Sequence, residues 1–192
     1  MAVTVIPNLV TGDECDAVGT WTGSPTLDID FFREATGALS AKVSNTTATF
    51  KYEAANVKGA WLDDSGTPTV QTAGANNDTI NDVSLLPAVG NIGVNDAYYF
   101  GGVGPFSRME VIIGTNGVGT WTITWEYWDG SAYTALAGVS DGSSGWTAGT
   151  GSRIISWTMP TNWAVKTEQS ISAFWVRARV SAFTSASTQP LG

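Results

Sequence analysis

The stretch Thr120-Trp-Thr-Ile-Thr-Trp-Glu-Tyr-Trp-Asp-Gly130 decides the fold class of this chain. Its residues alternate with the period of two that a half-buried strand requires, and one face carries Trp121, Ile123, Trp125 and Tyr127. The dipeptide Asp129-Gly130 follows directly, and a second short run begins at Tyr133. Such a dipeptide between alternating runs predicts a tight hairpin, in which Trp128 pairs with Ser131 and Trp125 pairs with Thr134.

Further strands are expected on both sides of this hairpin. Thr26–Phe32 and Ser172–Ser181 alternate in the same way. Shorter runs bounded by turn residues lie at 38–44, 47–52, 60–62, 68–71, 97–101, 107–113 and 153–158. Many short strands with Gly-rich turns and no long amphipathic helix predict an all-β fold. We expect a single domain over residues 1–192, a jelly-roll-like antiparallel β-sandwich with long loops and at most one short helix.

Two segments fit this pattern less well. Residues 53–96 are rich in loop signals, and Ile80, Val83 and Leu86 have helical spacing with Asp78 available as a cap. A short helix there and a long loop or arm that packs on a neighbouring subunit are both compatible with the sequence. The N-terminal residues 1–10 could act as an anchoring strand or arm that adds to an exposed sheet edge.

The composition removes most catalytic chemistry. The chain has no histidine, and Cys15 is its one cysteine, so His-based triads and zinc sites cannot form. Carboxylates remain, and a calcium site at Asp13, Glu14 and Asp16 is the metal site that we consider, although their spacing matches no EF-hand pattern. No two carboxylates are singled out as a glycosidase pair. We therefore expect a non-enzymatic protein that needs no cofactor.

The net charge of the chain limits the classes of partner that we expect. The formal net charge is −8, and the nine basic residues are scattered along the sequence. Phosphate binding needs clustered Lys and Arg, so we expect no nucleic-acid partner. No stretch approaches the length of a membrane helix, and the mildly apolar Ala2–Val10 contains Pro7 and lacks the basic start of a signal peptide. We expect neither membrane association nor secretion.

Nine tryptophans are the most distinctive feature of the composition. Flat aromatic rings can form a sugar-binding platform, but they more often fill a core because each ring buries a large apolar area. We expect Trp121 and Trp125 to be core residues. Trp128, Trp146 and Trp175 lie on strand faces or in loops that are otherwise polar, so we expect them to be exposed and to serve as interface or ligand residues.

Arg177 and Arg179 fall on the same strand face as Trp175. An arginine on this face could sit over an aromatic ring. The three residues are compatible with an oligomer contact or with a plain solvated face.

Four stretches carry a resemblance to known proteins: DAYYFGGVGPF (96–106), GTWTITWEYWDG (119–130), SWTMPTNW (156–163) and AFWVRARV (173–180). Together they resemble a pattern that recurs in structural proteins of tailed bacteriophages, in β-rich head-decoration, fibre and tail-associated modules. The resemblance covers about half of the chain, and no catalytic residues belong to it. It implies a component of the virion.

A capsid decoration (cement) protein fits this resemblance best, because the chain is short and has no heptads of a fibre. Such a protein would stabilise the phage head by contacts with the major capsid protein, as a homo-oligomer, with a trimer favoured. The alternative is a carbohydrate-binding module that attaches a phage tail or head appendage to a host surface glycan. A glycan-degrading enzyme is a third possibility, which would require a carboxylate pair.

Overall fold

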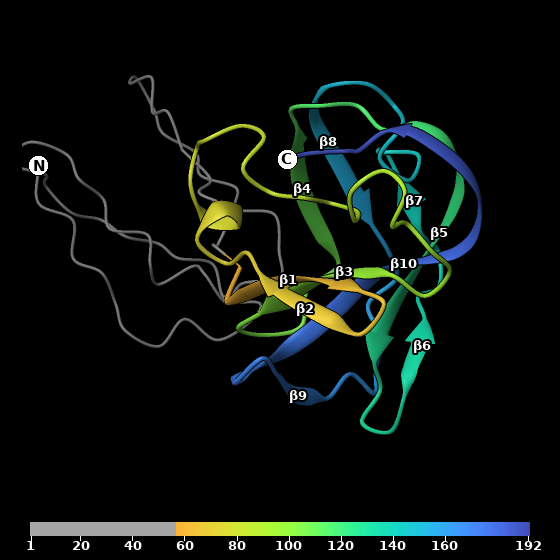
Figure 1. The fold of residues 1–192 in the computed structure, drawn as a ribbon. Helices are drawn as coiled ribbons and strands as arrows, with labels where there is room; N and C mark the ends of the chain where they lie inside the picture. The colour runs from red at the N-terminus through yellow and green to blue at the C-terminus, as the bar shows by residue number, and fades with distance from the viewer. Residues whose placement is uncertain (1–56) are drawn as a thin grey trace, which may run out of the picture. The chain divides into compact units, whose positions relative to one another are not determined.

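The structure, a computed structural model, describes residues 57–192 (Figure 1). The expected strands at 26–32, 38–44 and 47–52, the segment 1–10, and Asp13, Glu14 and Asp16 lie outside the described residues. The described part contains β1 (Gly59–Asp64), β2 (Thr67–Val70), β3 (Ala97–Gly102), β4 (Arg108–Ile113), β5 (Val118–Trp128), β6 (Tyr133–Ala135), β7 (Ser140–Asp141), β8 (Gly151–Ser156), β9 (Val165–Glu168) and β10 (Ile171–Thr188). No helix in it is long and apolar enough to cross a membrane.

The strands form two antiparallel sheets. The large sheet has the order β2-β1-β3-β10-β5-β6, and β9 pairs with the first residues of β10. The small sheet has the order β4-β8-β7. Figure 1 shows β4 and β8 lying together on one side of the large sheet. The predicted all-β, antiparallel sandwich architecture is therefore confirmed, whereas the jelly-roll connectivity stays a prediction.

The main core lies between the two sheets. β5 contributes Trp125 and Tyr127, β10 contributes Val176 and Val180, and β8 contributes Ile155. All five side chains are at most 8% exposed. Trp121 and Ile123 are half-buried and pack against the same cluster, so the predicted apolar face of β5 is confirmed.

The residues after β10 extend the small sheet. The Leu191 N–H donates to the Thr115 carbonyl at 3.0 Å, and the Thr115 N–H donates back at 3.1 Å. On its other side this tail, residues 190–192, pairs with residues 83–85; the Gly192 N–H donates to the Val83 carbonyl at 2.8 Å. The last segment of the chain thus lies as a short strand between two segments that are distant in sequence.

The short helix expected around Ile80, Val83 and Leu86 does not form. Val83 exchanges both of its backbone hydrogen bonds with Gly192, so its groups are used in sheet-like pairing rather than in a helix. Leu86 is fully buried as a loop residue. The one helical element among residues 57–192 is a single 3-10 turn, Gly74–Asn76. Residues 77–96 are therefore loop, as one of the two interpretations expected, and the packing of this loop on a neighbouring subunit stays a prediction.

The β5–β6 hairpin has a different register from the predicted one. Trp128 pairs with Tyr133 and Tyr127 pairs with Thr134, so four residues form the loop instead of two. The Asp129 carboxylate explains this, because it accepts hydrogen bonds from the N–H groups of Ser131 and Ala132, each at 2.8 Å. These bonds lower the pKa of Asp129 well below its usual range. An Asx-type loop thereby replaces the tight two-residue turn.

Candidate functional site

Trp175 was expected to be exposed and is fully buried. It lies on the outer face of the large sheet, the face that points away from the small sheet. Its ring crosses two glycines on neighbouring strands, Gly59 and Gly101, where a Cβ atom would come within 2.9 Å of the indole. The indole N–H donates to the Lys166 carbonyl at 2.9 Å. Two glycines therefore form a trough in the sheet that the Trp175 ring fills.

A second apolar cluster surrounds this ring. Its buried members are Trp61, Ala97, Tyr99, Ala173 and Trp175. All of them come from strands of the large sheet itself, whereas the main core draws on both sheets. The Trp61 and Tyr99 rings stack with centroids 3.8 Å apart and planes 10° apart. The outer face is therefore built from cross-strand side-chain packing.

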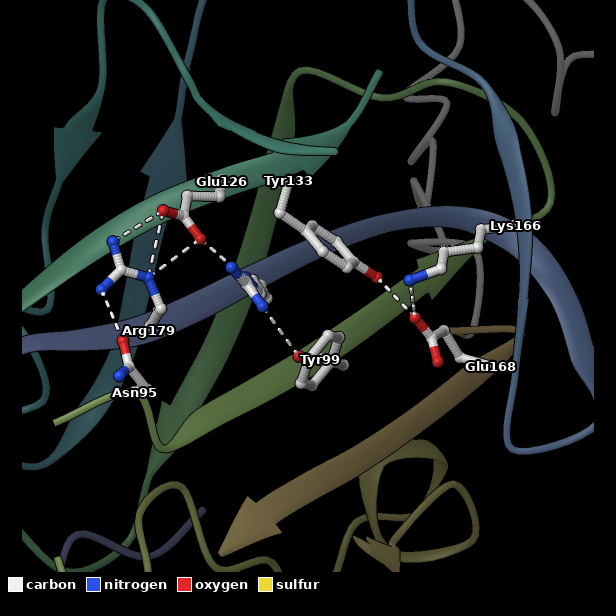
Figure 2. Close-up of polar contacts among 8 residues, drawn as sticks. Asn95, Tyr99, Glu126, Tyr133, Lys166, Glu168 and Arg179 are labelled. Carbon is white, nitrogen blue, oxygen red and sulfur yellow. Dashed lines mark hydrogen bonds and ion pairs between the residues drawn. The ribbon is translucent and has the colours of Figure 1, made fainter. Parts of the chain in front are cut away.

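Charged groups continue this face toward β5. Glu126 is 6% exposed and accepts hydrogen bonds from the Arg177 Nε at 2.6 Å and from the Arg179 Nη2 at 2.8 Å (Figure 2). Arg177 also donates to the Tyr99 hydroxyl at 3.0 Å, and Arg179 donates to the Asn95 side chain at 3.3 Å. Four strand or loop segments are tied together by one carboxylate and two guanidinium groups.

The electrostatics of this network favour its charged form. Burial by itself raises the pKa of Glu126, but hydrogen bonds and charge from Arg179 and Arg177 outweigh it and hold the pKa below its usual value. Burial raises the pKa of Tyr99, although Arg177 opposes that shift. Glu126 is the shared counter-ion of both guanidinium groups, so each ionised group here has a partner of opposite charge.

Cations and rings alternate at the β6–β9 end of the face. The Lys166 Nζ lies 4.1 Å from the centroid of the Trp128 ring and 4.7 Å from that of Tyr133. The Arg177 guanidinium lies 4.2 Å from the same Tyr133 ring. Figure 2 shows Tyr133 and Lys166 directed toward Glu168, which accepts from the tyrosine hydroxyl at 3.2 Å. Burial is the main reason that the pKa of Tyr133 is raised.

Trp146 was also expected to be exposed and is fully buried. Its loop turns inward because the Asp141 carboxylate accepts from the N–H groups of Ser143 and Gly145 and from the Trp125 indole. Ser144, Gly145 and Trp146 have positive φ angles of 49°, 65° and 76°. The two non-glycine residues are in the left-handed region, which costs of order 1–3 kcal/mol each. The packing of Trp146 against Trp125, with ring centroids 5.3 Å apart, offsets that cost.

The structure brings together three of the five predicted interface or ligand residues. Trp128, Arg177 and Arg179 lie on the outer face of the large sheet and are half-buried. Trp175 is a fully buried member of the cluster on the same face, and Trp146 lies in the main core. The prediction that an arginine covers an aromatic ring is correct for this face, although the rings are Tyr133 and Tyr99 rather than Trp175.

Sequence reasoning missed Glu126, Tyr99, Tyr133 and Lys166. Alternation along β5 places Glu126 on the same face as Trp128. Its partners could be found only from the pairing of β5 with β10, which places Arg177 opposite Glu126. The sequence signal was a lone carboxylate between aromatic residues on a strand; such a residue is rarely buried unless it is paired.

The described residues offer little catalytic chemistry. They contain no group of three metal-ligating side chains placed to hold an ion. Ser143 donates to a carboxylate, Asp141, but it is fully buried and therefore not accessible to a substrate. An open hollow of about 510 Å³ beside β1 and β2 is lined by Asp64, Gln71, Asp82 and Gln189, among others, and by no aromatic side chain.

Comparisons with known proteins assign no family. No protein-family model, no curated protein and no solved structure matches the chain.

Proposed function

We propose that this chain is a non-enzymatic structural component of a bacteriophage virion. Within that class we propose a capsid decoration protein, which binds the major capsid protein as a homo-oligomer, with a trimer favoured, and stabilises the head. The observation that carries the proposal is the use of the aromatic residues. All eight tryptophans among residues 57–192 are buried or half-buried, and those of the stretches that resemble phage proteins, except Trp128, belong to or pack against the two apolar clusters.

The charged residues support the same conclusion. Glu126 pairs with both Arg177 and Arg179, and Lys166 pairs with Glu168 at 2.5 Å. Catalytic sites usually hold charged groups in a cleft that a substrate can enter, and burial and neighbouring charges shift the pKa values of these groups strongly. Here four groups with shifted pKa values, those of Tyr99, Glu126, Tyr133 and Arg177, lie on a sheet face and contact one another or neighbouring charged side chains. The described residues thus favour a protein that acts through binding energy alone.

The carbohydrate-binding alternative has less support. Trp146 and Trp175 are fully buried, and Lys166 covers one face of the Trp128 ring at 4.1 Å. A pyranose that stacked on that face would have to displace the lysine. The open hollow beside β1 and β2 has carboxylate and amide groups that could bind hydroxyls, but it has no ring on which a sugar could stack.

Cosedimentation with phage capsids that lack the protein tests this proposal. We expect saturable binding of the full chain to such capsids, at a fixed number of copies per head, and no signal on an array of host glycans. Glycan binding without capsid binding would contradict the decoration role and favour the alternative. Loss of glycan binding in Trp128→Ala, with an unchanged unfolding midpoint, would then identify the platform.

A further inference from the structure

One edge of the small sheet is unpaired in the described part of the chain. β4 is the named strand at this edge of the sheet, and on this side the 190–192 tail hydrogen-bonds only with β4-side residues beyond Ile113, namely Gly114 and Thr115. The Ser107 carbonyl accepts a hydrogen bond from the Trp157 N–H at 2.9 Å, so Ser107 and every second residue after it in β4 direct their backbone groups toward β8. Because alternate residues of an antiparallel strand direct their backbone groups to the same side, Arg108, Glu110 and Ile112 direct theirs away from β8.

The C-terminal tail, residues 190–192, independently supports this assignment of backbone directions. The Gly114 N–H, two residues after Ile112, donates to the Leu191 carbonyl at 2.9 Å on the side away from β8. The same edge therefore already accepts a strand beyond Ile113. The outward N–H and carbonyl groups of Arg108 and Glu110 have no partner among the described residues, whereas the Ile112 carbonyl lies beside Gly192.

The other edge strands are less suited to pairing. β2 carries Pro68, which has no N–H to donate to a further strand. β6, β7 and β9 are shorter than β4, with three, two and four residues. β4 has six residues and no proline, and Arg108, Glu110 and Ile112 are exposed on the outer face of the small sheet. It is the edge on which another strand would fit.

We propose that β4 pairs with β4 of a second copy of this chain, antiparallel about a twofold axis at Met109. In that register Arg108 lies opposite Glu110 of the second copy, and the symmetry repeats this pair. Opposite charges across a strand pair stabilise it, and like charges destabilise it. A register centred on Glu110 would place two glutamates opposite each other, so charge selects the register centred on Met109.

This contact goes beyond the proposed function and does not depend on it. Charged residues on an edge strand also serve to prevent pairing with unrelated strands. Arg108 and Glu110 would do so against most partners and would be complementary to their own copy. The pairing therefore predicts self-association that depends on opposite charges at positions 108 and 110.

Sedimentation velocity of the full chain over a range of concentrations tests the proposal. The variants are Arg108→Glu, Glu110→Arg and the double exchange of both residues. Asp78→Arg is the matched control for Glu110→Arg, because it makes the same change in charge at an exposed loop residue. Thermal unfolding of each variant separates lost association from lost folding.

The expected results follow from the charge pairs. Each single variant places like charges opposite each other twice and should weaken association by about tenfold or more. The double exchange should restore it, and an equimolar mixture of the two single variants should associate more tightly than either alone. Asp78→Arg should associate like the parent chain. The proposal is overturned if the parent chain shows no association through this edge, or if any oligomer forms equally well in Arg108→Glu and Glu110→Arg.

Discussion

The two faces of the large sheet bury aromatic rings in different ways. The inner face packs Trp125 and Val176 against side chains from the small sheet. The outer face packs Trp61, Tyr99 and Trp175 within the large sheet, and the Trp175 ring lies in a trough made by Gly59 and Gly101. Arg177 and Lys166 then lie over the rings at its β6–β9 end. A sheet can therefore bury aromatic area on a face by pairing large residues with glycines on adjacent strands.

The largest expected effect comes from removing one ring from each face. Trp125→Ala and Trp175→Ala should each lower the free energy of unfolding by about 3–5 kcal/mol, since both side chains are buried. Guanidinium unfolding of the two variants measures this. An effect of Trp175→Ala below about 1 kcal/mol would show that the outer ring is not part of the folded core.

Glu126→Gln should have the next largest effect. It keeps the shape of the side chain but leaves two half-buried guanidinium groups without a carboxylate, and we expect a loss of about 2–3 kcal/mol. Glu168→Gln is the matched control, because its partner Lys166 is 30% exposed at the side chain; that change should cost about 1 kcal/mol or less. Equal losses in the two variants would argue against a special role for the Glu126 network.

Gly101→Ala tests the trough directly. The added Cβ would come within 2.9 Å of both the Trp175 ring and the Ala173 Cβ, so we expect a loss of about 1–3 kcal/mol. Gly104→Ala is the control, because a Cβ at Gly104 has no atom within 4 Å. If Gly101→Ala unfolds at the same denaturant concentration as the parent chain, then the ring does not rest on this residue.

Acid should weaken the outer face. The pKa of Glu126 in the folded chain is lower than the 4.5 of a free carboxyl, so the folded state favours the ionised form. Its contribution is full above that free value and is lost as the pH falls through the folded pKa. Unfolding midpoints measured from about pH 7 to about pH 3 should fall less steeply in Glu126→Gln than in the parent chain. Parallel curves would show that another carboxylate causes the loss.

The smallest expected effect is that of Lys166→Met. This change keeps the aliphatic stem and removes the cation from the Trp128 and Tyr133 rings, at a cost of about 0.5–1 kcal/mol. Tryptophan fluorescence should also change, because Trp128 loses the charge beside its ring. An unchanged spectrum would place Lys166 away from Trp128 in solution.

The sequence predicts those features that depend on a single strand. The alternation in β5 correctly assigned Trp125 and Tyr127 to the core. It could not predict the burial of Trp175, because the glycines beneath that ring belong to two other strands and become its neighbours only through sheet pairing. Trp146 was misjudged for a related reason, since a polar Gly/Ser loop gives no sign that Asp141 will turn it inward.

The candidate site was predicted in part. Arg177 and Arg179 were correctly placed on one face from the period of two. Their carboxylate partner was not predicted, because Glu126 meets them only in the register that joins β5 to β10. Alternation assigns a residue to a face, whereas the partners on that face depend on strand order, which local sequence patterns do not encode.

The most direct test of the proposed function is the temperature at which phage heads release their DNA. Heads that lack this protein should rupture at a lower temperature than complete heads, and adding the purified chain should restore the higher temperature. Heads that release DNA at the same temperature with and without the chain would contradict the decoration role.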